Sequence, residues 1–209
     1  MYMSKNWNYY EELKLLAREK RSLYEVDLQP LDLNKIRNIY RQEGIKIKLS
    51  TGTLRNLKAA YFNDENGTDV LLNSKLPREA KIFALIHELK HHYVDANNHD
   101  VFCLKDYDDE PEIEKGAEVF AAEFIWPEDL FLSEATDFGL KQGNCSPELI
   151  VRFKKQILSP VSYTFIRKRL EWFKLIEKGE HTGVKFKNLE YELFGIPYHL
   201  RKKHYYSMN

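Results

Sequence analysis

Residues 87–91 read His-Glu-Leu-Lys-His, and this H-E-x-x-H pattern restricts the local fold more than any other feature of the chain. Two histidines four positions apart lie about 40° apart around an α-helix, so both imidazoles can reach one metal ion if the segment is helical. Glu88 then stands close enough to poise a water molecule. The pattern is typical of zinc-dependent hydrolases.

The residues around the motif also predict a helix. Pro77 suits a first helical turn, and apolar side chains then recur with helical spacing at Ile82, Ile86, Leu89 and Tyr93. This core-facing stripe leaves the two histidines and Glu88 on a neighbouring face. The alternative interpretation is a histidine-bearing surface helix that binds no metal.

Composition sets modest limits on the fold and on partners. A chain of 209 residues with 43% hydrophobic residues can bury a core and form one main domain. Lys plus Arg equals Asp plus Glu, but residues 105–123 hold eight acids and two bases, whereas residues 152–209 hold thirteen bases and five acids. An acidic centre and a basic tail indicate a cation site followed by a candidate anion-binding surface, or ordinary solvated faces.

The cysteine count and the first residues indicate a compartment. Cys103 and Cys145 are too few for a disulfide scaffold, which favours a reducing environment. Residues 1–10 lack an apolar signal core, and no run approaches the roughly 20 apolar residues of a membrane span. We therefore expect a soluble, cytoplasmic protein without a membrane partner.

The order of predicted elements indicates an α+β fold. Helical spacing covers residues 9–23 and 33–42, and strand patterns cover residues 45–49, 58–63 and 69–73. Asp32 is a predicted cap for the second helix, and Gly44 is expected to end it. The last two strands are expected to form a hairpin that leads into the motif helix.

A third protein ligand is needed, because catalytic zinc usually takes three side chains and one water. The extended H-E-x-x-H-x-x-G-x-x-H pattern is excluded, since Val94 and Asn97 replace its Gly and its third His. The best donor is the predicted helix at residues 112–123, in which Glu114 and Glu118 lie one turn apart beside a core stripe. One can bind the ion while the other accepts a hydrogen bond from a ligating imidazole. Minor alternatives as ligands are Asp95 and Cys103.

The run from Glu114 to Pro127 reads E-x-x-A-x-x-F-A-A-x-x-x-x-P. It resembles the second motif of the ImmA/IrrE family of zinc metallopeptidases, commonly E-x-x-A-N-x-F-A-A-x-L-L-M-P, which follows an H-E-L-G-H helix. The strand that begins Gly44-Ile45-Lys46-Ile47 resembles the family's "G-I-x-V", so the resemblance covers residues 31–132. It implies a zincin-like core whose small three-stranded sheet packs on the HExxH helix, followed by a mostly helical C-terminal region.

On this resemblance, the zinc ligands are His87, His91 and Glu114. Glu88 becomes the catalytic base, and Glu118 becomes the carboxylate that supports a ligand. Zinc would polarise the scissile carbonyl and lower the pKa of water towards about 7, while Glu88 moves the proton to the leaving amine. The expected cofactor is Zn²⁺, although Mn²⁺ or another divalent ion suits the same ligands. Candidates for the oxyanion donor are Tyr93, Tyr107 and His92.

Three positions depart from the family pattern. Lys90 replaces Gly, Glu118 replaces Asn, and Trp126 replaces Met, so each adds bulk or charge near the site. Lys90 is expected either to point to solvent or to pair with an acid of residues 106–114. These departures bear on catalytic efficiency more than on metal binding.

The C-terminal region carries two predicted helices, at about 146–158 and 161–176, which together resemble a helix-turn-helix. Family members often carry a "V-S-x-x-x-x-x-R-L" segment here, so a packing role competes with phosphate contact by residues 167–169. The predicted division of the chain is a metallopeptidase core with N-terminal helices at 1–145 and a helical, basic region at 146–209.

The resemblance implies a regulatory, zinc-dependent endopeptidase whose substrate is a protein such as a transcriptional repressor. No helix-turn-helix precedes the core, so the repressor is expected to be a separate protein. Two alternatives are a catalytically weak or inactive metal-binding regulator of a transcription factor, and a DNA-binding protein that acts through its C-terminal helices.

Overall fold

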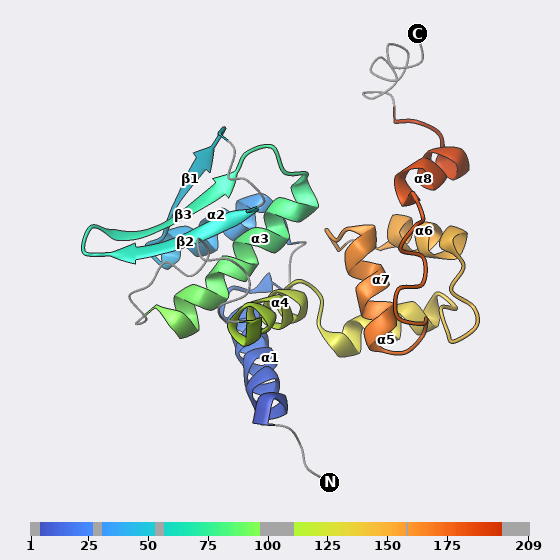
Figure 1. The fold of residues 1–209 in the computed structure, drawn as a ribbon, viewed down its shortest axis with the longest axis horizontal. Coiled ribbons are helices and arrows are strands. Elements are labelled where there is room, and N and C mark those ends of the chain that lie inside the picture. The colour runs from blue at the N-terminus through green and yellow to red at the C-terminus, as the bar shows by residue number, and fades with distance from the viewer. Residues whose placement is uncertain (1–4, 27–30, 53–56, 97–110, 158, 198–209) are drawn as a thin grey trace. The chain divides into compact units, whose positions relative to one another are not determined.

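The computed structural model describes residues 5–26, 31–52, 57–96, 111–157 and 159–197. It is an α+β structure, mostly helical, with one small sheet, as the sequence predicts (Figure 1). The chain divides into two compact units. Unit 1 comprises residues 1–130 and 159–161, and unit 2 comprises residues 131–158 and 162–209.

The sheet of unit 1 has three strands in the order β1-β3-β2. They are β1 (Lys46–Ser50), β2 (Ala59–Asp64) and β3 (Gly67–Asn73). β2 and β3 form the predicted antiparallel hairpin, whereas β1 pairs with β3 in parallel. Val70 and Leu72 of β3 are buried at alternate positions, so one face of the sheet contributes to the core.

Four helices complete unit 1 together with a π-helical turn. They are α1 (Lys5–Leu23), α2 (Leu33–Gln42), α3 (Arg78–Lys90) and α4 (Pro111–Ile125), and the π turn η2 (His91–Asp95) continues α3. α3 packs on β2 and β3, α2 and α4 contact α3, and α1 lies along α4 (Figure 1). α3 is therefore the central element of unit 1.

Local sequence explains where these helices begin. Asp32 caps α2 by accepting a hydrogen bond from the backbone N–H of Lys35 at 2.8 Å, as predicted from its side chain. The Tyr40 hydroxyl of α2 donates to the Leu85 carbonyl of α3 at 2.6 Å, which fixes the two helices together. The predicted core-facing stripe of α3 is confirmed at Ile82, Ile86 and Leu89, whose side chains are fully buried.

Unit 2 is helical. α5 (Glu128–Asp137) begins at the end of unit 1, and α6 (Pro147–Gln156), α7 (Tyr163–Trp172) and α8 (Phe186–Phe194) follow. Ser146 and Ser162 cap α6 and α7 through their side-chain oxygens, close to the helix starts predicted at about residues 146 and 161. None of the helices in the described part of the chain combines the length and apolarity that a membrane span requires.

Candidate metal centre

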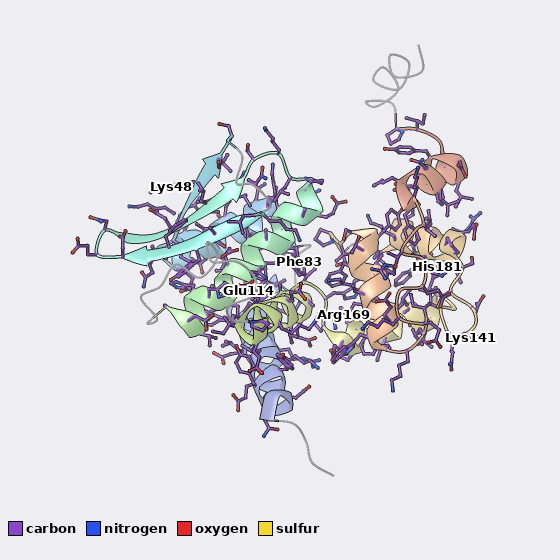
Figure 2. All side chains as sticks on the ribbon, viewed as in Figure 1. Lys48, Phe83, Glu114, Lys141, Arg169 and His181 are labelled. Carbon is purple, nitrogen blue, oxygen red and sulfur yellow. The ribbon has the colours of Figure 1, made fainter. Side chains whose placement is uncertain are left out.

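The H-E-x-x-H residues occupy the end of α3 and the start of η2. His87 and Glu88 lie in the last turn of α3, and His91 is the first residue of η2. Glu114 lies in the first turn of α4, which packs against α3, and Figure 2 labels its position. α3, the η2 turn that continues it, and α4 therefore bring the motif and a distant carboxylate together.

Three side chains of this region converge on one point. The ligand atoms of His87, His91 and Glu114 all lie within 4.8 Å of one another. His87 Nε2 is 3.1 Å from Glu114 Oε2, and His91 Nε2 is 3.7 Å from Glu114 Oε1. Ligand atoms about 2.0–2.1 Å from a tetrahedral zinc lie about 3.3 Å apart, so two imidazoles and one carboxylate at these separations fit the ion.

The cluster is largely closed to solvent. His91 is fully buried, Glu88 is 3% exposed, and the side chains of His87 and Glu114 are 13% and 16% exposed. His87 and Glu114 thus keep partial contact with solvent, and a catalytic metal site requires a position that water and substrate can reach.

Burial and charge oppose each other at His87. Burial lowers the pKa of His87, but the hydrogen bond to Glu114 and the charges of Glu88, Glu114 and Glu118 outweigh it and raise that pKa. Burial likewise raises the pKa of Glu114, and its contact with His87 and the charge of His91 outweigh burial and lower it. The arrangement therefore carries an excess of negative charge around the imidazoles, which suits a cation.

Asp95 supports His91 from the end of η2. Asp95 Oδ2 is 2.8 Å from His91 Nδ1, and an ionised carboxylate only accepts hydrogen bonds, so we assign the imidazole proton to Nδ1. Nε2 is then the nitrogen with a lone pair, on the side of Glu114. Burial raises the pKa of Asp95, but hydrogen bonds from His91 and Lys90 outweigh burial and lower it.

Two of the departures from the family pattern are placed in detail. Lys90 is fully buried, so the expectation that it points to solvent is wrong, and its ammonium donates to Asp95 at 2.7 Å. Glu118 lies 3.4 Å from the Lys115 ammonium, and its charge is among those that raise the pKa of His87. The supporting role of Glu118 stays a prediction. Trp126 is buried directly after the end of α4.

The oxyanion candidates have partners of their own. The Tyr93 hydroxyl donates to the Tyr24 hydroxyl at 3.4 Å, and His92 Nδ1 lies 3.1 Å from the Tyr61 hydroxyl. Burial lowers the pKa of His92 against the opposing charge of Glu43. Tyr107 lies outside the described residues, as does the alternative ligand Cys103.

The sequence predicts Asp95 only as a minor alternative ligand and does not predict its contact with His91. A signal existed, because Asp95 follows His91 by four residues, a spacing at which side chains meet on one face of a helix. The burial of Lys90 had no comparable signal, since lysine is rarely buried and its neighbours here come from α4 and η2.

An HExxH helix against a small mixed sheet, with a glutamate from the next described helix beside both histidines, defines a zincin-like fold of the metallopeptidase class. Residues 41–171 match the profile of the peptidase M78 family, described as the IrrE N-terminal-like domain. The match covers well over half of the chain, and the chain belongs to this family. No curated protein matches the chain.

Proposed function

We propose that the chain is a zinc-dependent endopeptidase with His87, His91 and Glu114 as metal ligands and Glu88 as catalytic base. The observation that carries the proposal is the convergence of three ligand atoms within 4.8 Å of one another, beside the glutamate of the same motif. The family of the chain is a peptidase family, which supports the same reaction class.

The chemistry follows from the residues of the cluster. A divalent ion bound there supplies a Lewis acid that polarises a peptide carbonyl and acidifies water. Glu88 follows His87 directly in the motif, and in this proposal its carboxylate accepts a proton from water and returns it to the leaving amine. Asp95 holds the His91 ring by its Nδ1–H, which keeps Nε2 available as a ligand atom.

The finer proposal concerns substrate and setting. We propose a regulatory role, in which the enzyme cuts a separate protein such as a transcriptional repressor in the cytoplasm. The resemblance to the ImmA/IrrE motifs supports the regulatory role. A reducing compartment agrees with Cys145, which is a free buried cysteine.

The basic residues of α7 bear on the alternative of DNA binding. Of the basic run on α7, Arg169 is 6% exposed and lies over the Phe165 ring at 5.6 Å, and Arg167 pairs with Glu171. Side chains engaged within the unit favour a packing role over phosphate contact. We propose residues 146–209 as a supporting region of the peptidase.

The first experiment measures zinc in the purified protein by elemental analysis, for the wild type, Glu114→Ala and Glu88→Gln. We expect about one zinc per chain in the wild type and in Glu88→Gln, and loss in Glu114→Ala, because only the last removes a ligand. Absence of zinc in the wild type after dialysis against a zinc buffer would refute the metal site.

The second experiment measures peptide-bond hydrolysis on a proteome-derived peptide library, with new termini identified by mass spectrometry. Glu88→Gln is the matched control, since it keeps the shape and the metal ligands while removing the base. We expect its rate to fall by about 10²- to 10⁴-fold. Zinc binding without cleavage by the wild type would favour the metal-binding regulator instead.

A further inference from the structure

Lys90 is a fully buried lysine directly before a candidate metal ligand. Lysine is almost never buried unless its ammonium is paired, because removal of the charge from water is costly. Here the ammonium donates to Asp95 Oδ2 at 2.7 Å and to the backbone carbonyl of Ile113 at 3.3 Å. These two contacts offset part of the free-energy cost of removing the ammonium from water.

The two partners of Lys90 belong to η2 and α4, two of the three elements that present the metal ligands. Asp95 Oδ2 also accepts the hydrogen bond from His91 Nδ1 at 2.8 Å, so one carboxylate oxygen joins Lys90 to His91. Ile113 immediately precedes Glu114 in the first turn of α4. One ammonium therefore lies between the group that orients His91 and the backbone that carries Glu114.

We propose that Lys90 is a positioning residue that clamps His91 and Glu114 into metal-binding geometry, through Asp95 on one side and the Ile113 carbonyl on the other. Lys90 does not touch the ion or the substrate. It holds Asp95 in one position, which fixes the His91 ring, and it ties the start of α4 to the end of α3.

A neighbouring helix closes the compartment around this lysine. The Tyr9 ring of α1 lies 5.8 Å from the Lys90 ammonium, a distance at which a cation is attracted to an aromatic face. α1 approaches α4 closely at Gly116, where an added Cβ would lie 2.7 Å from the Tyr9 hydroxyl. Tyr9 lies outside the residues that match the family, so the chain's own N-terminal helix contributes to the clamp.

The clamp rests on the proposed function, because positioning matters only if the cluster binds a metal. Its distinctive prediction is non-additivity. If Lys90 acts on His91 through Asp95, removal of the ammonium and removal of the carboxylate disrupt the same connection, and the second change adds little to the first.

The test is zinc affinity, measured by competition with a chromophoric chelator, for the wild type, Lys90→Met, Asp95→Asn and the double variant. We expect each single variant to bind zinc about 10- to 100-fold more weakly, the range typical for loss of the group that supports a ligand. We expect the double variant to bind no more than about threefold more weakly than the weaker single.

A spectroscopic readout separates positioning from a general effect on folding. With Co²⁺ in place of zinc, the visible absorption bands report the ligand field directly, and we expect them to move in both single variants. Glu190→Gln is the matched control, because it removes an ion-paired carboxylate in unit 2. We expect it to leave zinc affinity and the cobalt bands unchanged.

Folding is checked by far-ultraviolet circular dichroism of the metal-free proteins. Lys90→Met leaves Asp95 charged in a closed compartment and can prevent folding, whereas the double variant removes both charges. If Lys90→Met does not fold, Asp95→Asn is compared with the double variant. The clamp is supported if these two proteins have the same zinc affinity and the same cobalt bands, and if both differ from the wild type in these properties.

Three outcomes would overturn the clamp. Wild-type affinity and cobalt bands in folded Asp95→Asn would show that His91 keeps its position without the carboxylate that Lys90 holds. Additive losses in the double variant would show that Lys90 does not act through Asp95. A wild-type protein that binds neither zinc nor cobalt would refute the proposed function and the clamp together. In the other two outcomes the wild type still binds metal, so only the clamp is refuted.

Discussion

Glu114 is the candidate ligand that comes from a second helix, and its two oxygens face both histidines, at 3.1 Å and 3.7 Å. A ligand that binds only the folded state stabilises it by mass action, by about 2.7 kcal/mol at a free concentration 100 times its Kd. We therefore predict that zinc raises the unfolding temperature of unit 1 by several degrees in the wild type. Differential scanning calorimetry with zinc, and again with excess EDTA, measures this shift.

The variants of the cluster make the thermal prediction specific. Glu88→Gln should show the full zinc-dependent shift, because it keeps all three ligands, whereas Glu114→Ala should show almost none. A zinc-dependent shift of equal size in Glu114→Ala would place the zinc elsewhere on the folded protein, for example on other histidines.

At the residue scale, the sequence predicted the members of the cluster but not their surroundings. Motif spacing alone brought His87, Glu88 and His91 to one helix face, and the paired motif added Glu114. The environment of Lys90 depends on a carbonyl of α4 and a carboxylate of η2, which no local pattern encodes. Tertiary packing determines which side chains of different elements meet, and the spacing of residues along the sequence does not reveal that packing.

At the scale of elements, the predictions were best where local chemistry sets the boundary. α2 matches its predicted range, because the Asp32 side chain caps its first turn and Gly44 adopts a φ of 72° after its last turn. No residue pattern predicts the π turn η2, which interrupts the helical pattern at His91. Such turns depend on tertiary contacts and often occur at functional sites.

The contact between α1 and α4 gives a prediction about Gly116. A Cβ at this position would lie 2.7 Å from the Tyr9 hydroxyl and 2.9 Å from Leu13 Cδ1. Overpacking of this kind costs about 1–3 kcal/mol, which exceeds the roughly 0.8–1.0 kcal/mol that alanine gains over glycine in a helix. We predict that Gly116→Ala lowers the free energy of unfolding by about 1 kcal/mol, measured by urea denaturation of the metal-free protein.

Gly183→Ala is the control for this prediction, since a Cβ there meets nothing within 4 Å. We expect its unfolding free energy to stay within about 0.5 kcal/mol of the wild type. A Gly116→Ala protein that is more stable than the wild type would contradict this prediction. It would mean that α1 can move away from α4 without a loss of stability.

At the scale of the whole molecule, the family match and the two units divide the chain differently. The match covers residues 41–171 and so includes the metal cluster of unit 1 and the helices α5, α6 and part of α7. α1 and α8 lie outside it, yet α1 packs on the helix that carries Glu114. The predicted boundary at residue 145 rested on a local helix start at Ser146, and it stays a prediction.

Glu190 gives unit 2 a pH-dependent stability of its own. Its carboxylate accepts hydrogen bonds from the Tyr163 hydroxyl and the Lys187 ammonium, and it pairs with Lys155, so it joins α6, α7 and α8. Burial raises the pKa of Glu190, but Lys187, Lys155 and Tyr163 outweigh burial and lower the pKa from 4.5 to about 2. A lowered folded-state pKa stabilises the folded form above pH 4.5, and this contribution is lost as the pH falls towards 2.

We predict that Glu190→Gln destabilises unit 2 by about 2 kcal/mol near pH 7, a value that allows for solvent screening of the two lysines. The deficit should shrink as the pH falls from 5 to 3, because the wild type then loses the same charge. Urea denaturation across this pH range measures it, with Glu192→Gln on the exposed side of α8 as the control. A deficit that is independent of pH would mean that the hydrogen bonds of Glu190 stabilise unit 2 without a contribution from its charge.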